Sequence, residues 1–311
     1  SIRRAKTDKI DSAHIAVFGL TYWEELSPVL PTDDVYLELK LLARQYYQTV
    51  SILVKAKVNL SNLLDQVMPD IQTVLQDNPC HHRLTDFVVR YYHYGHILEM
   101  GKSKFTSDYC KWAKKQGYRM CERSAEKIFA LVQNGIPALP NSPVTKVVVV
   151  EAVRMLHQIE ASRDTILARM QDFAKTLPEY SVVREMPCIG DTLAPRIIAE
   201  IGDVRRFKNK HSLIAYAGID APPYQSGAFN AVERHISKRG NSYLRKTGYE
   251  IMQSLIQHKP IGDSVYNFIQ KKRLEGKCGK EAMIAGLNKF LRIYYGKVTE
   301  LYNDCDKQLT A

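Results

Sequence analysis

Two long arrays of apolar side chains, spaced alternately three and four residues apart, constrain the fold of this chain most. The first array ends before Pro69 and contains Val35, Leu39, Leu42, Tyr46, Thr49, Leu53, Ala56, Leu60, Leu63 and Val67. The second ends before Pro178 and contains Val149, Ala152, Leu156, Ile159, Arg163, Ile166, Met170, Phe173 and Leu177. This spacing is typical of coiled-coil helices. We expect two long helices, which either pair antiparallel as a coiled-coil arm or serve as core helices of a bundle.

Prolines and changes of composition divide the rest of the chain. Residues 6–19 read as a short helix that ends at a glycine, and a proline-rich connection follows it. A helical region with an irregular insertion at 78–140 then extends to residue 177. Beyond Pro178 the elements become shorter and richer in glycine and basic residues, before amphipathic helices return towards residue 311. The sequence therefore predicts a mainly α chain divided at 1–27, 28–177 and 178–311.

The insertion at 78–140 mixes aromatic and basic residues. Its prominent members are Tyr91, Tyr92, Tyr94, Tyr109, Lys102, Lys104, Lys111, Lys114 and Lys115. Aromatic rings interleaved with cations suit stacking on nucleic-acid bases. Tyrosines at helical spacing also pack in protein cores, so the insertion is either a nucleic-acid surface or an ordinary helical subdomain.

The charge and the cysteines restrict the class of partner and the compartment. A formal net charge of +11 favours a polyanionic partner, although a solvated basic surface would give the same total. No apolar run is long enough to span a bilayer, and no basic amphipathic anchor is evident. The six scattered cysteines include no closely spaced pair, which is typical of free thiols in a reducing cytoplasm. We expect nucleic acid rather than a membrane as the partner.

Residues 186–202 carry the pattern of a helix-hairpin-helix. A tight turn at Ile189 and Gly190 leads into a second helix that opens near Thr192, and the small Ala194 faces its neighbour. Backbone amides at such a turn and at a helix N-terminus bind phosphate without reading sequence. A plain helical hairpin is the alternative. A basic segment follows directly and contains Arg205, Arg206, Lys208, Lys210 and His211.

The next segment, 216–227, places Ser226 before a glycine in a proline-containing loop. A serine at such a position is commonly a turn residue. Cations close downstream make a nucleophile possible, because a serine that attacks phosphorus needs positive charge around the crowded oxygens. The candidate nucleic-acid-binding residues of this region are Arg234, His235, Lys238, Arg239, Asn241 and Arg245. We expect a turn at 235–241 that leads into a basic helix. Alternatively, these basic residues form only a solvated surface.

Near the start of the chain, Asp8 and Asp11 lie three residues apart and share one helical face. Paired carboxylates commonly hold Mg²⁺ for phosphodiester chemistry. No convincing third and fourth carboxylate is evident elsewhere in the sequence, so this pair forms half of a metal site.

Several motifs in the right order resemble the IS110 (IS116/IS902-type) family of insertion-sequence transposases, which are DEDD-type, bridge-RNA-guided recombinases. These motifs are residues 5–11, Pro187–Gly190, Tyr216–Gly218, Gln225–Gly227 and Ile236–Asn241. The resemblance implies an N-terminal RuvC-like (RNase H-like) nuclease domain with four acids, a coiled-coil domain, and a C-terminal transposase domain with a nucleophilic serine. Asp8 and Asp11 would be the last two acids and metal ligands for Mg²⁺, and Ser226 would be the serine that links covalently to DNA.

The same resemblance implies a structured guide RNA and a dimer of dimers as partners. The first two acids of the family would precede Ser1, so residues 1–27 would be the end of a RuvC-like domain, and we expect a truncated chain that does not cleave DNA alone. Two other functions stay open. One is nucleic-acid binding without cleavage, and the other is a protein that assembles through its coiled coil.

Overall fold

The structure is a computed structural model that describes residues 8–24, 33–77, 82–118, 122–221, 225–226, 229–230 and 235–310. The chain forms two compact units. One contains residues 1–40 and 173–311, and the other contains residues 41–172. The described residues are mainly helical, as the sequence predicts, and the one sheet among them is an antiparallel pair of two-residue strands.

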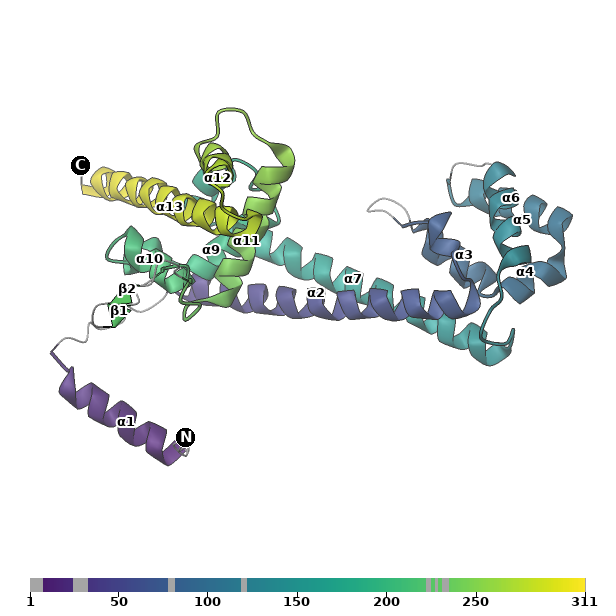
Figure 1. Ribbon diagram of the computed structural model, residues 1–311, viewed down its shortest axis with the longest axis horizontal. Helices are drawn as coiled ribbons and strands as arrows, with labels where there is room; N and C mark the ends of the chain where they lie inside the picture. Colours follow the sequence, from purple (N-terminus) through teal and green to yellow (C-terminus); the bar gives the residue numbers. More distant parts are fainter. Residues whose placement is uncertain are drawn as a thin grey trace. The chain divides into compact units, whose positions relative to one another are not determined.

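The two heptad arrays form long helices, α2 (Asp34–Val67) and α7 (Pro143–Lys175), which Figure 1 shows. The prediction of two long helices that end close to Pro69 and Pro178 is therefore confirmed. In α2, however, Ala43 and Leu64 are fully or almost fully buried, whereas Leu42 and Leu63 are only half-buried. A straight helix has 3.6 residues per turn rather than the 3.5 of a strict heptad, so its buried stripe drifts from one position to the next.

Within the unit of residues 41–172, α2 and α7 contribute to one core and run in opposite directions. Gln66 O accepts hydrogen bonds from the amides of Ala138 and Leu139, just before α7 begins, while Lys57 pairs with Glu160 farther along that helix. The shared cluster includes Leu53, Ala56, Leu60, Leu64, Val149, Val153 and Leu156. The antiparallel pairing agrees with the heptad pattern, and a coiled coil in the strict sense stays a prediction.

Among the described residues, five short helices between α2 and α7 complete this core, and the last four lie in the insertion. They are η1 (Ile71–Thr73), α3 (Arg83–Tyr91), α4 (Tyr94–Met100), α5 (Lys102–Lys115) and α6 (Glu122–Asn134). The rings of Phe87, Phe105 and Trp112 pack against one another and against Tyr91 and Tyr109. This cluster is the densest aromatic packing among the described residues.

The tyrosines of the insertion are therefore core residues. Tyr91, Tyr94 and Tyr109 are at most 1% exposed, so the hypothesis that they stack on nucleic-acid bases is wrong. Their hydroxyls find partners inside the protein, as when Tyr91 OH donates to Asp108 Oδ2 over 2.7 Å and Tyr94 OH donates to Pro69 O over 2.6 Å. Tyr92 is half-buried and stacks on His96. The lysines of α5, in contrast, are exposed.

The other unit is built on the long C-terminal helix α13 (Gly279–Thr310). This helix packs against α8 (Glu179–Arg184), α10 (Lys210–Ala217), α11 (Ser242–His258) and α12 (Ser264–Leu274). Between α8 and α10 lie α9 (Leu193–Ile201), which packs against α11, and η2 (Val204–Arg206). Gly248 lets α11 approach α13 closely, because a Cβ at that position would lie 2.4 Å from Leu287 Cδ1.

A buried carboxylate joins three helices of this unit. Glu179 of α8 is fully buried and accepts hydrogen bonds from Tyr36 OH over 2.7 Å and from Tyr302 OH over 2.6 Å. The two phenol oxygens are 2.9 Å apart. Burial and the neighbouring negative charge of Glu179 raise the pKa of Tyr36 well above its usual value. This hydrogen-bonded triad fixes the start of α2 against α8 and α13.

Helix α1 (Asp8–Thr21) carries no buried residue, although Ile15, Phe18 and Leu20 are apolar and exposed. The RNase H-like remnant at residues 1–27 and the three-part division at 27/28 and 177/178 remain predictions. No helix among the described residues is long and apolar enough to cross a membrane.

Candidate nucleic-acid interface and serine loop

Residues 179–201 form two short helices joined by a tight turn. Gly190 O accepts hydrogen bonds from the amides of Leu193 and Ala194, both over 3.0 Å, and this starts α9. Arg184 Nε lies 2.8 Å from Asp191 Oδ1 and ties the end of α8 to the turn. The left-handed residue of the turn is Cys188, with φ 62°, whereas an added Cβ at Gly190 would meet open space. Two helices and a turn are thus present, and phosphate binding by the turn stays a prediction.

An exposed basic rim follows α9 and consists of Arg205, Arg206, Lys208, Lys210 and His211. Both arginines already interact with other side chains of this unit. Arg205 forms an ion pair with Asp203 at 2.8 Å and lies 4.4 Å above the Tyr302 ring, and Arg206 lies 4.5 Å above the Tyr216 ring. Asn209 caps α10 through hydrogen bonds from the amides of His211 and Ser212.

Two segments beyond the rim pair with each other and form a clasp, which we define as residues 216–220 bonded to residues 237–241. Three backbone hydrogen bonds hold it. Asn241 N donates to Tyr216 O over 2.6 Å, Lys238 N to Gly218 O over 3.0 Å, and Ser237 N to Asp220 O over 2.9 Å. At its open end, Ser237 Oγ donates to Asp220 Oδ1 over 2.6 Å. The clasp therefore closes the base of the segment 221–236.

Two glycines let the clasp form. Gly218 ends α10 with φ 65°, a left-handed conformation that glycine adopts without strain. Gly240 faces it so closely that an added Cβ would lie 2.1 Å from Tyr216 O and 2.5 Å from Gly218 N. No residue with a side chain fits at position 240 unless the two strands of the clasp separate.

Ser226 lies in the segment that the clasp closes. It belongs to β1 (Gln225–Ser226), which pairs antiparallel with β2 (Phe229–Asn230), and its register partner is Phe229. Arg234, a candidate nucleic-acid-binding residue, lies outside the described residues. His235 is exposed just before the clasp, and Lys238 and Arg239 are exposed within its second segment. Ser226 thus lies in an antiparallel pair of short strands within this segment, and exposed cations follow where the chain returns.

Asn241 and Arg245 make internal contacts. Asn241 caps α11 by accepting hydrogen bonds from the amides of Tyr243 and Leu244, and its Nδ2 donates to Glu200 Oε2 over 2.8 Å. Arg245 Nη1 donates to Ala217 O over 2.9 Å and to Gly240 O over 3.1 Å. Both side chains hold the clasp on α9, α10 and α11. The helix predicted after residues 235–241 is confirmed as α11, whereas residues 235–241 themselves form an irregular segment with a bend at Gly240 rather than a turn.

Tyr216 is an important residue that the sequence did not single out as a site residue. Burial alone would raise the pKa of its phenol. Hydrogen bonds with Arg206 and Asn241 and the positive charge of Arg206 outweigh that effect, so the pKa of Tyr216 is lowered. Asn241 Nδ2 lies 3.2 Å from its hydroxyl. Tyr216 therefore links the basic rim to the clasp. The only sign of this role in the sequence is that the motif Tyr216–Gly218 is followed by a later motif that ends in Gly240 and Asn241.

Asp8 and Asp11 lie in the first turn of α1, exposed and half-exposed respectively. Together they offer two of the six oxygen ligands that an octahedral Mg²⁺ takes. Across the described parts of the chain, one group of three metal-binding side chains is close enough to share an ion, and it lies elsewhere, at His82, His157 and Glu160. No third described carboxylate therefore joins the pair on α1.

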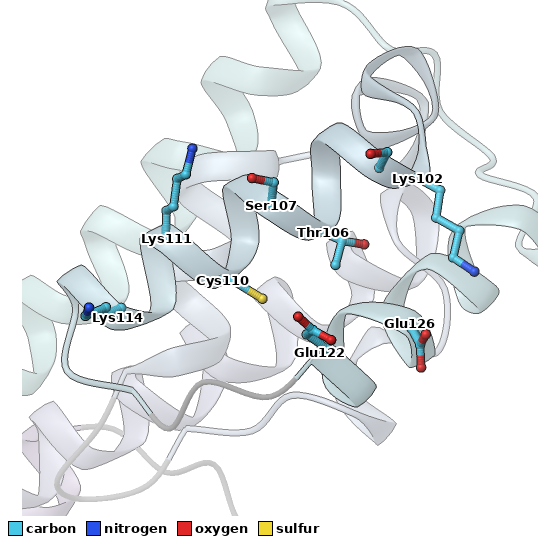
Figure 2. Close-up of a pocket in the computed structure, with 9 residues that line it drawn as sticks. Lys102, Thr106, Ser107, Cys110, Lys111, Lys114, Glu122 and Glu126 are labelled. Carbon is cyan, nitrogen blue, oxygen red and sulfur yellow. The ribbon is translucent and has the colours of Figure 1, made fainter.

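The exposed lysines of the insertion border an open cavity of about 720 Å³ between α5 and α6. Figure 2 shows Thr106 and Cys110 on α5 facing Glu122 and Glu126 on α6. Lys102, Lys111 and Lys114 line the same cavity from α5. Because acidic and basic groups share its wall, the cavity offers no uniformly positive surface for a phosphate backbone.

Two family models match this chain. Residues 180–267, which include the hairpin, the basic rim and the clasp, match the model described as the transposase IS116/IS110/IS902 family. Residues 1–69, which include Asp8 and Asp11, match a model of the DEDD transposases of IS110. These matches define the class as transposases and recombinases, which are enzymes that act on DNA. Within that class, the chain belongs to the IS110 family of insertion-sequence transposases.

Relatives with curated names agree with this family. The chain is 22% identical to the insertion element IS110 uncharacterized 43.6 kDa protein of Streptomyces coelicolor, over 90% of this chain and 67% of that protein. It is 27% identical to pilin gene-inverting proteins of Moraxella bovis and Moraxella lacunata, over 39% of this chain and 37% of each relative. The chain therefore spans about two thirds of the first relative and little more than a third of the other two.

Proposed function

We propose that this chain binds DNA and recombines it through Ser226, as part of a bacterial insertion sequence. The observation that carries the proposal is the placement of Ser226 on a hairpin whose base is closed by the clasp, within the segment that the transposase family model matches. Exposed cations flank this segment in the sequence and suit contact with phosphates: Lys208 and Lys210 precede it, and Lys238 and Arg239 follow it.

In the proposed reaction, Ser226 Oγ attacks a DNA phosphorus atom. Ser226 Oγ loses its proton as the Oγ–P bond forms, the scissile P–O bond breaks, and the leaving deoxyribose oxygen takes up a proton, so that no net proton is consumed. Rejoining to a second strand reverses these changes. The cations of the rim and the clasp stabilise the negative charge on the phosphoryl oxygens. Asp8 and Asp11 contribute carboxylates to a site for Mg²⁺, which would supply further stabilisation of that charge when bound.

The basic residues available for DNA contact favour the backbone over the bases, so we propose that a structured guide RNA selects the sequence. The long helices α2 and α7 are the proposed route to a homo-oligomer. The site of action would be the bacterial cytoplasm, at the nucleoid.

The test is a covalent-adduct assay with labelled DNA that carries the ends of the element, together with the RNA of the element. The proposal requires that the unchanged chain form a denaturation-resistant protein–DNA adduct, and the absence of any adduct would instead favour the expectation from the sequence that the chain does not cleave DNA alone. Ser226→Ala should lose the adduct and all strand exchange while its Kd for DNA stays within about twofold. Ser162→Ala, at an exposed serine of α7, is the matched control, and Ser237→Ala tests the alternative nucleophile, whose hydroxyl donates to Asp220. An adduct that survives Ser226→Ala and disappears in Ser237→Ala would reverse the assignment.

A second candidate function is nucleic-acid binding without cleavage. It is favoured by the finding that Asp8 and Asp11 gather no third described carboxylate. A cleavage assay in Mg²⁺ separates the two functions, since a chain that only binds would retain DNA and leave it intact. Cleavage that appears only when a second transposase chain is added would show that another chain supplies further carboxylates.

A further inference from the structure

A cluster of side chains of the types that bind metals lies in the unit of residues 41–172, whereas Ser226 and α1 belong to the other unit. His82 precedes the first residue of α3, and His157 and Glu160 lie three residues apart on one face of α7. One ligand atom from each of the three lies within 4.8 Å of the others. The two imidazole rings are 4.8 Å apart between centroids and inclined at 56°, so they converge on a common space and are not stacked.

We propose that His82, His157 and Glu160 bind a zinc ion, with water completing the tetrahedron, and that this ion clips the start of α3 to α7. Two imidazoles and one carboxylate form a donor set suited to Zn²⁺, at bond lengths of roughly 2.0–2.2 Å. Ligand atoms around such an ion lie about 3.3 Å apart, so the three side chains need only small rotations to close on it. The nitrogen donors separate this ion from Mg²⁺, which prefers oxygen ligands only.

A buried threonine fixes which nitrogen of His157 faces the metal. Thr85 is 1% exposed, and its hydroxyl donates to His82 O over 3.2 Å. The same oxygen lies 3.1 Å from His157 Nε2. In the proposed complex the Thr85 hydroxyl donates to this carbonyl and accepts a hydrogen bond from His157 Nε2, which leaves the lone pair of His157 Nδ1 for the metal. A metal-binding histidine that donates its other N–H to a fixed acceptor is typical of zinc sites.

Lys57 competes with the metal for Glu160. Its Nζ lies 3.2 Å from Glu160 Oε1, and Lys57 is 55% exposed while Glu160 is 17% exposed. The ion pair neutralises the carboxylate that zinc needs, and the exposed lysine can swing away into solvent at little cost. Removal of Lys57 should therefore strengthen zinc binding, whereas a carboxylate that served only in this ion pair would give no such gain.

The experiment titrates Zn²⁺ into the full chain, freed of metal by chelation, against a competing chromogenic indicator. We expect one zinc ion per chain and a higher Tm in its presence, because a ligand that binds only the folded state stabilises it. His157→Gln and Glu160→Gln should each weaken zinc binding at least about tenfold. His157→Gln keeps an N–H that can reach Thr85, and metal-free thermal melts verify that both variants fold. Lys57→Ala should tighten binding several-fold, and His258→Gln, an exposed histidine of α11, should leave it unchanged.

The variants at positions 157 and 160 decide the outcome, because Cys80 and His81 precede His82 in the sequence and could bind zinc without α7. Unchanged zinc affinity in both α7 variants would overturn the proposal, and so would the absence of a one-to-one complex. Weaker binding in both α7 variants together with tighter binding in Lys57→Ala would establish it.

Discussion

The hydroxyl of Ser237 donates a 2.6 Å hydrogen bond to Asp220 Oδ1, and this bond joins the two ends of the segment that carries Ser226. The backbone repeats the connection, because Ser237 N donates to Asp220 O over 2.9 Å. The pair lies where the clasp ends and the loop begins. How firmly the loop is held therefore depends on two side chains that are 17 residues apart in the sequence.

Loss of this side-chain bond should loosen the loop. Ser237→Ala removes one hydrogen bond to a charged group, which is worth about 1.5–3 kcal/mol, and leaves the backbone bonds of the clasp in place. We expect faster proteolytic cleavage within 221–236 and only a small change in Tm. Ser162→Ala, which removes an exposed serine on α7, is the matched control. Equal cleavage rates for the unchanged chain and Ser237→Ala would show that the backbone alone holds the loop.

The contact between Gly240 and Tyr216 should tolerate no side chain. Gly240→Ala places a Cβ 2.1 Å from Tyr216 O, so the clasp must open or shift, and we expect a loss of about 2 kcal/mol or more in the free energy of unfolding. The matched variant is Gly296→Ala in α13, where an added Cβ meets nothing within 4 Å. That change should stabilise the chain by about 0.5–1 kcal/mol, because alanine favours a helix interior. Urea unfolding of both variants measures the difference, and a stable Gly240→Ala would contradict the packing.

The triad around Glu179 should make stability sensitive to alkaline pH. The pKa of Tyr36 is raised, by burial first and then by the charge of Glu179, so Tyr36 contributes stability that is complete below its ordinary pKa of about 10. That contribution is lost as the pH rises above 10 towards the raised pKa, at up to about 1.4 kcal/mol per pH unit.

Tyr36→Phe should therefore be less stable than the unchanged chain near neutrality, by about 1.5–3 kcal/mol for a bond to a charged acceptor. The gap should shrink in strongly alkaline solution, since phenylalanine has no proton to lose. Urea unfolding at about pH 8 and about pH 11 measures the gap, and an equal difference at both values would count against the assignment.

The basic rim should contribute unequally to DNA binding. Lys208→Ala and Lys210→Ala should each reduce the slope of log K against log salt by about 0.9, if each lysine neutralises one phosphate. Arg205→Ala should change the slope less, because Arg205 is already paired with Asp203 at 2.8 Å. Lys307→Ala, near the end of α13, is the control and should leave the slope unchanged. Equal slopes for all four variants would place the DNA surface elsewhere.

The loss of stability on truncating a leucine of α2 should depend on whether that leucine lies on the buried face of the helix. Leu64 is 1% exposed and Leu63 is half-buried, although the heptad pattern selects Leu63. Leu64→Ala should cost about 2–5 kcal/mol, and Leu63→Ala clearly less. Thermal melts of the two variants compare neighbouring leucines in the same helix. The reverse order would show that the strict heptad register describes α2 better than the structure does.

Local patterns predicted the helices well. The spacing of apolar residues identified α2 and α7, and Pro69 and Pro178 marked where they end, because both signals act within a few turns of one helix. The exact buried face was harder to predict, since it depends on whether the helix keeps 3.5 or 3.6 residues per turn. The role of the tyrosines in the insertion was predicted wrongly for a related reason. Tyr91 and Tyr109 lie on the buried faces of α3 and α5, whereas the lysines lie on the exposed face of α5. Only the packing of α3, α5 and α6 reveals which faces are buried.

The clasp could not be predicted from local patterns. Asp220 and Ser237 are separated by a loop, and Asn241 reaches Glu200 across 41 residues. Hydrogen bonds at such separations depend on how α9, α10 and α11 pack, and no short motif encodes that packing. Asn241 was selected as a residue for nucleic acid, yet an asparagine directly before a helix is also the commonest kind of N-cap. The role of Asn241 as an N-cap could therefore have been predicted from the local sequence.

The clasp should also make the stability of the neighbouring helices independent of the length and sequence of the loop. Residues 216–220 and 237–241 are hydrogen-bonded to each other. The entropic cost of closing the loop between them therefore rises only slowly with loop length, by about 0.6 kcal/mol for each doubling. Insertions and exchanges between those two strands should therefore leave α10 and α11 intact. We therefore expect the sequence around the proposed nucleophile, Ser226, to vary without a change in the helices on either side.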